Sequence, residues 1–377
     1  MSWMTAEAAL ALLGTKPQTL YANVSRGRIA ARADPDDPRR SLYRQEDVER
    51  LAARQKGRRP AAAVAAESIA WGEPVLSTAI STVAQGRLVY RGRDAVALAE
   101  RAGLEEAAAL LWPSAAVPDF SGRARANRPG MAAAYRAVAE LAATDMPAAG
   151  RARPVLLADA ARTVGFLAGA LAEPGTQPLH RRLAARWQRP EAADIIRRAL
   201  VLLAEHELNA STFAARVTAS TGAPLAAAVL AGLAALSGPL HGNASLGMAG
   251  LVERAGRHGA EAAVAAHLRQ GQPLPCFGHR LYPEGDVRAP ALLAGFALPP
   301  PYAALAEAGT RLTGEQPNID FALAALTSAF ALPADAPLQL FALARSVGWI
   351  AHALEQIETG ALIRPRARYV GASAPQG

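Results

Sequence analysis

The segment Val217–Val252 contains no lysine, arginine, aspartate or glutamate, although charged residues make up 19% of the chain. Such a run must lie either in a membrane or inside a folded core, and it is long enough to span a bilayer. Pro224, Pro239 and His241 interrupt it, and its apolar part, Pro224–Leu236, is mostly alanine and leucine. We therefore expect a buried core helix here and no membrane span.

The rest of the composition agrees with helices packed closely in a globular protein. Hydrophobic residues make up 51% of the chain and aromatic residues only 5%, with alanine throughout, which favours a mainly α fold over a β-sandwich. The length of 377 residues exceeds the roughly 250 to 300 over which one core keeps growing. We expect one large unit and one small unit.

The single cysteine, Cys276, excludes an internal disulfide framework and a cysteine-based zinc cluster. It suits a reducing compartment. No N-terminal stretch combines a basic region, an apolar core and a cleavage site, so the sequence predicts a cytoplasmic protein without an export signal.

Positive charge is concentrated at the N-terminus. The formal net charge is +8, and residues 1–60 carry twelve basic against seven acidic residues, so five of those charges lie in this short segment. A basic unit on a nearly neutral body fits a polyanion partner for the small unit alone, and an arginine-rich composition is the alternative.

The N-terminal segment has the signals of two short helices followed by a hairpin. Thr5 can cap a helix over Ala6–Leu13, and a second helix is expected to end near Val24. The turn cluster at 34–38 lies between two extended segments, and a third helix is expected over Gln45–Arg54.

This order of elements resembles the MerR/excisionase type of winged helix-turn-helix over residues 1–56. The resemblance implies that the second helix faces the DNA major groove and that the wing contacts phosphates. The candidate DNA-binding residues are Gln18, Thr19, Tyr21 and Asn23 on the helix and Arg39 and Arg40 on the wing. A structural or dimerisation role is the alternative.

Residues 57–67 have the composition of a linker, and the body is predicted over 68–371. The segments 79–83 and 86–94 predict an extended hairpin at its start. Helical periodicity follows, divided by prolines.

Three histidines lie where helices are expected to begin or end: His206, His241 and His279. They are about 35 residues apart without a short ligand pair, so we expect no metal site. A histidine at a helix end is also often a cap or a satisfied core residue.

Arginines near these motifs favour an anionic substrate. Several planar guanidinium forks are what a di- or tricarboxylate requires. The arginines are Arg288, Arg345, Arg364 and Arg366. Asp320 lies between apolar residues, which would raise its pKa and make it a candidate base, or it is a helix N-cap.

Four motifs in the body resemble the citrate synthase family, over residues 68–371. They are His206–Thr212, Ser237–Gly242, Phe277–Tyr282 followed by Asp286 and Arg288, and Pro317–Phe321, with Arg345–His352 and Arg364–Arg366 towards the C-terminus. The resemblance implies a multi-helix fold with large and small subdomains and a homodimer. It also implies the condensation of acetyl-CoA with oxaloacetate to citrate and CoA, a tricarboxylic acid cycle reaction, with the thioester as substrate and no cofactor.

The resemblance also implies roles for individual residues. Asp320 is the base, His241 donates a hydrogen bond to the thioester oxygen, and His279 polarises the ketone and protonates the alkoxide. If residues 238–240 lead into a helix, its dipole would keep His241 neutral. The oxaloacetate carboxylates are held by His206, Arg288, Arg345 and Arg364, the last from the second subunit. Backbone groups that meet the coenzyme A adenine come from Pro275, Cys276, Phe277 and Gly278.

The chain departs from the family pattern at several positions. Asn243 and Cys276 replace glycines, Ser245 an asparagine, Val287 a proline and Ala322 a tyrosine. These changes leave the donor open between acetyl-CoA and propionyl-CoA, which would give 2-methylcitrate. Two further hypotheses are a DNA-binding regulator whose body senses CoA thioesters or oxaloacetate, and a related condensation with another keto acid.

Overall fold

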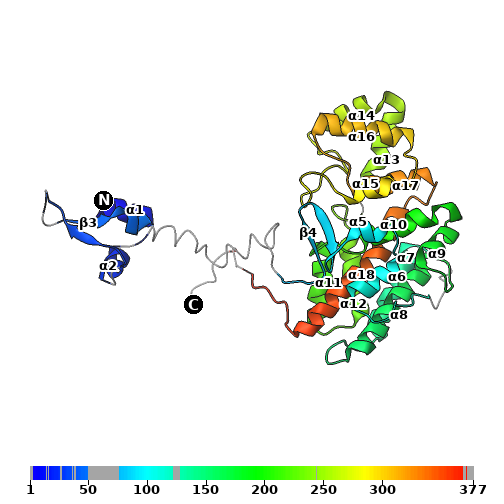
Figure 1. The fold of residues 1–377 in the computed structure, drawn as a ribbon, viewed down its shortest axis with the longest axis horizontal. Coiled ribbons are helices and arrows are strands. Elements are labelled where there is room, and N and C mark those ends of the chain that lie inside the picture. The colour runs from blue at the N-terminus through cyan, green and yellow to red at the C-terminus, as the bar shows by residue number, and fades with distance from the viewer. Residues whose placement is uncertain are drawn as a thin grey trace. The chain divides into compact units, whose positions relative to one another are not determined.

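The computed structural model forms two compact units, Met1–Ser77 with Arg366–Gly377, and Thr78–Pro365 (Figure 1). It describes residues 3–13, 15, 17–25, 28–35, 37, 40–49, 76–121, 128–242, 244–367 and 371. The predicted boundaries at 56 and 67 fall outside the described residues, so they stay predictions.

Within the described residues, the N-terminal unit contains the two predicted short helices, two strands around the predicted turn and a first strand, Trp3–Thr5, that was not predicted. Its elements are β1 (Trp3–Thr5), α1 (Ala6–Leu13), α2 (Pro17–Ser25), β2 (Ala31–Ala33) and β3 (Ser41–Arg44), with 45–49 also helical. The strands form an antiparallel sheet in the order β1-β3-β2. The backbone N–H of Ala8 donates to Thr5 Oγ1 at 3.3 Å, which confirms the predicted cap. DNA binding by this unit stays a prediction.

The second unit begins with the predicted hairpin. β4 (Ser81–Ala84), β5 (Arg87–Tyr90) and β6 (Arg93–Asp94) form an antiparallel sheet in chain order. Gln85 and Gly86, between β4 and β5, both have positive φ, +52° and +72°. Such a two-residue turn matches the twist of the flanking strands.

Helices make up the rest of this unit. They are α5 (Ala95–Ala99), α6 (Leu104–Leu111), α7 (Met131–Thr144), α8 (Arg153–Leu171), α9 (Leu179–Arg186), the 3₁₀ turn η1 (Pro190–Ala192), α10 (Ala193–Leu203), α11 (Ala210–Ser220), α12 (Leu225–Leu236), α13 (Leu246–His258), α14 (Ala260–Leu268), α15 (Arg288–Leu293), α16 (Pro300–Thr313), α17 (Ile319–Ala329) and α18 (Ala336–Thr359). The prediction of a mainly α protein is confirmed.

Two hydrophobic cores divide the helices of this unit. The larger core is built around α12 and α18 and includes the side chains of α6, α8 and α10. The smaller core joins α13, α14, α16 and α17 through residues such as Met248, Leu251 and Leu305. In Figure 1, α13, α14 and α16 stand apart from the layer that contains α8, α12 and α18.

The apolar part of the uncharged segment, Pro224–Leu236, lies in the core as expected. α12 buries Leu225, Val229, Leu233 and Leu236 within the larger core. α8 is the one described helix with the length and hydropathy to cross a membrane, and 56% of its apolar window is buried in the protein. Buried core helices of globular proteins share this composition.

Candidate active site

His206 lies in the short segment between α10 and α11, which is attached to the hairpin. Glu207 has φ +52°, and its carboxylate accepts a hydrogen bond from the backbone N–H of Val83 at 2.8 Å. Asn209 caps α11 by accepting from the N–H of Thr212, and its amide nitrogen donates to the His206 carbonyl at 3.2 Å. These bonds fix the backbone on both sides of His206.

The His206 ring is buried among other polar rings. Its Nε2 lies 3.0 Å from Tyr282 Oη, and its centroid lies 5.0 Å from that of His279 in an edge-to-face arrangement. Burial, followed by the charges of Arg288 and Arg345, holds the pKa of His206 well below its usual range. His206 is therefore a neutral imidazole at physiological pH.

His241 lies in a turn rather than at a helix start. Residues 237–242 form turns after α12, and α13 begins only at Leu246, so His241 lies between two helices as expected, but residues 238–240 do not lead directly into a helix. The N–H of Gly242 returns to the Leu236 carbonyl at 3.0 Å, which shapes the turn. Burial and then the charge of Arg345 lower the pKa of His241 to about 4. The expected neutrality of His241 is thus present, with burial as its main cause.

Ser211 is the contact that orients His241. Its Oγ lies 2.8 Å from His241 Nε2, accepts from Trp349 Nε1 at 3.0 Å and donates to Asn209 Oδ1 at 2.7 Å. Ser211 is fully buried in α11. The buried hydroxyl therefore joins α11, α18 and the His241 turn.

His279 belongs to a loop that is bonded to the start of α17. The N–H of Gly278 donates to the Gln316 carbonyl at 2.8 Å, and the N–H of Asn318 donates to the Cys276 carbonyl at 2.9 Å. His279 Nδ1 accepts from the N–H of Leu281 at 3.2 Å, so the proton of the neutral ring lies on Nε2. Burial and then Arg288 lower the pKa of His279 to about 4.

Asp320 is the second residue of α17, and its N-cap alternative is wrong. The cap is Asn318, whose Oδ1 accepts from the N–H of Asp320 at 3.0 Å. Asp320 Oδ1 is buried and has no hydrogen-bond partner in the described part of the chain. Burial raises the pKa of Asp320 to about 7, against the opposing charges of Arg288 and Arg345. The carboxylate can therefore exchange a proton near neutral pH.

Arg288 and Arg345 lie close enough to these groups to shift their pKa values, and both are 2% exposed. Arg288 donates from Nε and Nη2 to the two oxygens of Asp286, each at 2.8 Å. Asp286 Oδ2 also accepts from the N–H of Ile319 at 3.0 Å, which ties the pair to the start of α17. Arg345 donates from Nε to the Leu203 carbonyl at the end of α10, at 2.8 Å.

Arg364 is not brought to this group by its own chain. It is exposed in the segment after α18, and its side chain makes no hydrogen bond or ion pair with the described residues. The predicted contact of Arg364 with the substrate, from a second subunit, stays a prediction.

The side chains of Cys276 and Phe277 in the predicted coenzyme A loop face inward, and the Cys276 carbonyl and the Gly278 N–H are bonded to Asn318 and Gln316. Cys276 and Gly278 have φ of +63° and +68°. Cys276 Sγ contacts the Ala244 carbonyl at 3.4 Å, and the Phe277 ring packs edge-to-face on Phe321 at 5.5 Å. Pro275 precedes them in a turn. Asn243 lies outside the described residues, and Ser245 precedes α13 without a capping hydrogen bond from its side chain.

The candidate DNA-binding residues are only partly available to a ligand. Thr19 is exposed, Tyr21 is 57% exposed, and Arg40 pairs with Asp37 at 3.3 Å on the surface. Asn23 is 7% exposed and donates to the Thr19 carbonyl at 2.8 Å within α2, so its predicted place on the groove-facing surface is wrong. The Gln18 side chain and Arg39 lie outside the described residues.

Sequence reasoning missed several residues that position this site. Ser211 and Asn209 orient His241, Tyr282 contacts His206, and Asp286 and Asn318 connect the His279 loop to α17. All five lie within or beside the motifs, yet no local signal marked them as partners. Within the described ranges, no group of three or more histidine, cysteine, aspartate or glutamate side chains could hold a metal ion.

A family model for the citrate synthase C-terminal domain matches residues 154–366. Citrate synthase 2 of Bacillus subtilis is 30% identical over an alignment that covers 80% of this chain and 94% of that protein. The chain belongs to the citrate synthase family. It is accordingly an enzyme of the citrate synthase type, an acyltransferase.

Other relatives divide between two activities. Citrate synthase of Haloferax volcanii is 39% identical over 46% of this chain and 49% of its own, and 2-methylcitrate synthase 1 of Corynebacterium glutamicum is 38% identical over 48% and 51%. Among solved structures, citrate synthase of Thermotoga maritima has a TM-score of 0.64 at 26% identity, over 81% of this chain and 96% of that one. This family member therefore has a citrate or 2-methylcitrate synthase type of function.

Proposed function

We propose that this enzyme condenses acetyl-CoA with oxaloacetate to give citrate and CoA. The observation that carries the proposal is Asp320, a carboxyl with a pKa of about 7 and an unpartnered oxygen, grouped with two neutral histidines and two buried arginines. A base of this pKa can take a proton near neutral pH.

The first step is removal of a methyl proton from the thioester. Asp320 takes that proton, and the charge moves to the thioester oxygen as an enolate. His241 would donate a hydrogen bond from Nδ1 to this oxygen. A neutral imidazole carries one N–H, so Nε2 must then act as a hydrogen-bond acceptor. The Ser211 hydroxyl, 2.8 Å from Nε2, can donate that hydrogen bond if it turns away from Asn209.

The second step forms the carbon–carbon bond. His279 would donate from Nε2 to the ketone oxygen of oxaloacetate, since its Nδ1 is occupied by the N–H of Leu281. The enolate carbon attacks the polarised ketone carbon, and His279 gives its proton to the new alkoxide. Water then hydrolyses the citryl thioester to citrate and CoA.

The buried cations would bind oxaloacetate. Asp286 occupies Nε and Nη2 of Arg288, so Nη1 is the nitrogen left for a substrate carboxylate. Arg345 and His206 would complete the contacts within one chain. Arg364 would come from a second copy, which makes the working unit a homodimer.

Coenzyme A would lie along the backbone of Pro275–Gly278, as the inward side chains of Cys276 and Phe277 favour. The solved citrate synthase of Thermoplasma acidophilum, with carboxymethyl coenzyme A and oxaloacetate, has a TM-score of 0.65 to this chain at 24% identity. The likeness supports a common fold, and the choice of ligands for this chain belongs to the proposal. We also propose that the enzyme acts in the cytoplasm, in the tricarboxylic acid cycle.

The test is release of free thiol on mixing the full chain with oxaloacetate and either acetyl-CoA or propionyl-CoA. A higher kcat/KM with acetyl-CoA supports citrate synthesis, and the reverse order would make the protein a 2-methylcitrate synthase. Asp320→Asn keeps the shape of the side chain and removes the base. Thiol release by this variant at the native rate would refute the mechanism.

We also propose DNA as a partner of the N-terminal unit, because Thr19 and Tyr21 lie exposed on α2 and the segment is basic. Duplex DNA should be retained at low salt and released as salt rises. Deletion of residues 1–56 should abolish retention. Absence of retention at low salt would leave this unit with a structural role.

A further inference from the structure

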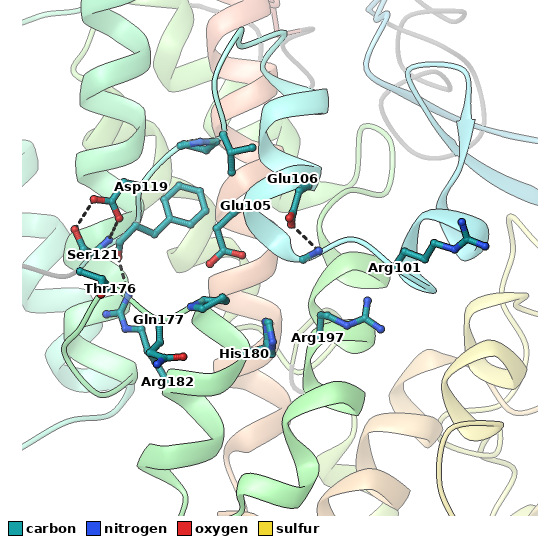
Figure 2. A pocket seen from close by; sticks show the side chains of 15 residues that line it. Arg101, Glu105, Glu106, Asp119, Ser121, Thr176, Gln177, His180, Arg182 and Arg197 are labelled. Carbon is teal, nitrogen blue, oxygen red and sulfur yellow. Dashed lines mark hydrogen bonds between the residues drawn. The ribbon is translucent and has the colours of Figure 1, made fainter.

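A cavity of about 390 Å³ opens at the surface of the second unit, where exposed residues such as Arg101 and Val117 form part of its lining, and the proposed catalytic residues do not line it. It is bounded by the start of α6, the loop before Ser121 and the segment that enters α9 (Figure 2). Pockets for small ligands have volumes of this order, and the space exceeds what one or two waters fill at about 30 Å³ each.

Arg182 brings an unpartnered donor to this cavity. The residue is 3% exposed; Nε donates to the Glu173 carbonyl at 2.6 Å and Nη1 to the Phe120 carbonyl at 2.8 Å. Arg182 Nη2 is buried and has no hydrogen-bond partner among the described residues. Neutral carbonyls thus satisfy two nitrogens, and among the described residues no carboxylate hydrogen-bonds the guanidinium. Burial lowers the pKa of Arg182, and the charges of Glu105 and Asp119 act in the opposite direction, so a bound anion would add to the stabilisation of the charged form.

His180, on the same helix α9, supplies a second open position. Its Nδ1 is buried without a partner among the described residues. Burial, with the charges of Arg197 and Arg181, lowers the pKa of His180, so the ring is neutral at physiological pH. A neutral imidazole can present an N–H at Nδ1.

The acidic residues that line the cavity are already engaged. Glu106 accepts from the N–H of Gly103 at 2.7 Å, and Asp119 accepts from the N–H and hydroxyl of Ser121, as Figure 2 shows. Glu105 accepts from the N–H of Leu179 at 2.7 Å, and burial raises its pKa.

We propose that this cavity binds a small organic oxyanion, a carboxylate or a phosphate, with one oxygen on Arg182 Nη2 and a second contact at His180 Nδ1. The two buried donors without partners among the described residues, the buried guanidinium and the volume all fit this class. Charge-assisted hydrogen bonds from a guanidinium to such an oxygen are among the strongest available in a protein.

Two elements lead from the cavity to the proposed substrate arginine. Arg197, on α10, lines the cavity, and Leu203 at the other end of α10 accepts from Arg345. α6 begins at the cavity, and Trp112 after it donates from Nε1 to the Val347 carbonyl in α18 at 2.8 Å. Through these elements an anion in the cavity would change the KM for oxaloacetate. This regulatory effect rests on the proposed function, whereas binding of the anion to the cavity does not.

The test is calorimetric titration of the full chain with inorganic phosphate, malonate and glycerol 3-phosphate. His180→Phe removes the ring nitrogen and keeps the carbonyl contacts of Arg182, so it separates binding from stability. Arg182→Gln removes the charge. Arg181→Gln, an exposed neighbour, is the control with equal loss of charge.

At least one probe should bind the native chain saturably. Affinity should fall at least tenfold in His180→Phe and Arg182→Gln, and stay within twofold in Arg181→Gln. Absence of saturable binding to the native chain would mean that the cavity holds only water. Equal affinity in native and His180→Phe chains would place the anion elsewhere. Either result overturns the proposal, and neither depends on catalysis.

Discussion

Gly232 in α12 is the point at which the core and the proposed active site can be perturbed together. A Cβ at this position would lie 2.5, 2.7 and 2.9 Å from Cδ2, Cε2 and Cε3 of Trp349 in α18. Carbon atoms in contact are normally about 3.5 to 4.0 Å apart, so the ring would have to move by about 1 Å. Gly232→Ala should therefore cost about 1 to 3 kcal/mol of unfolding free energy, as overpacking of a tight core usually does.

The same movement should reduce turnover. Trp349 Nε1 donates to Ser211 Oγ at 3.0 Å, and a shift of about 1 Å would break this bond. The net value of such a bond, about 0.5 to 1.5 kcal/mol, corresponds to a roughly two- to tenfold loss if Ser211 positions His241. We expect lower kcat for thiol release with a smaller change in KM.

The assay is chemical denaturation of the full chain beside thiol release. Gly256→Ala is the matched control, because Gly256 is exposed in α13 and has nothing within 4 Å of an added Cβ. Alanine there should stabilise the helix by roughly 0.5 to 1 kcal/mol without loss of activity. A Gly232→Ala chain as stable as native would refute the packing argument, and unchanged kcat would refute the link from Trp349 to His241.

Three further predictions follow from the same region. The base must be ionised and the pKa of Asp320 is about 7, so kcat/KM for thiol release should fall as the pH falls through about 7. A profile of kcat/KM that stays level from pH 8 to 5 would contradict this prediction. Arg288→Lys replaces two hydrogen bonds to Asp286 with one point charge in a buried site. Chemical denaturation should show that the free energy of unfolding falls by about 3 to 5 kcal/mol, as when a buried ion pair is broken, and a decrease under 1 kcal/mol would contradict this. Tyr282→Phe leaves His206 without its 3.0 Å partner and should raise the KM for oxaloacetate severalfold with little change in stability, and an unaltered KM would argue against a role for that contact.

Local signals in the sequence were sufficient for many elements. Thr5 caps α1 as predicted, and the segment 86–94 forms the expected hairpin, in which Gly86 and Gly92 adopt positive φ in the turns. The apolar part of the uncharged run forms the core helix α12 because an alanine- and leucine-rich helix is stable in water only when it is buried. Each of these inferences depends on residues within a few positions of one another.

Hydrogen-bond partners that lie far apart in the sequence could not be predicted from such local signals. Ser211 lies 30 residues before His241, and Asp286 lies 33 residues before Ile319, yet each pair is hydrogen-bonded. A serine after an asparagine predicts a helix start, and nothing local says that its hydroxyl will face a histidine. The prediction that Asn23 faces a ligand was wrong for the opposite reason. Its side chain donates a hydrogen bond to the Thr19 carbonyl in its own helix instead of extending from the surface.

The low pKa of His241 comes from burial and a side-chain charge rather than from a helix dipole, so the pKa should respond to substitution of that side chain. A helix dipole would have kept this ring neutral through a fixed backbone, insensitive to side-chain substitution elsewhere. Burial and the charge of Arg345 do so instead, and Arg345 also lowers the pKa of His206 and opposes the raised pKa of Asp320. His241, the proposed base Asp320 and the proposed substrate ligand His206 thus share one electrostatic source on α18. Loss of that charge would raise the pKa values of both histidines and of Asp320 together, moving the whole pH dependence of the reaction upwards.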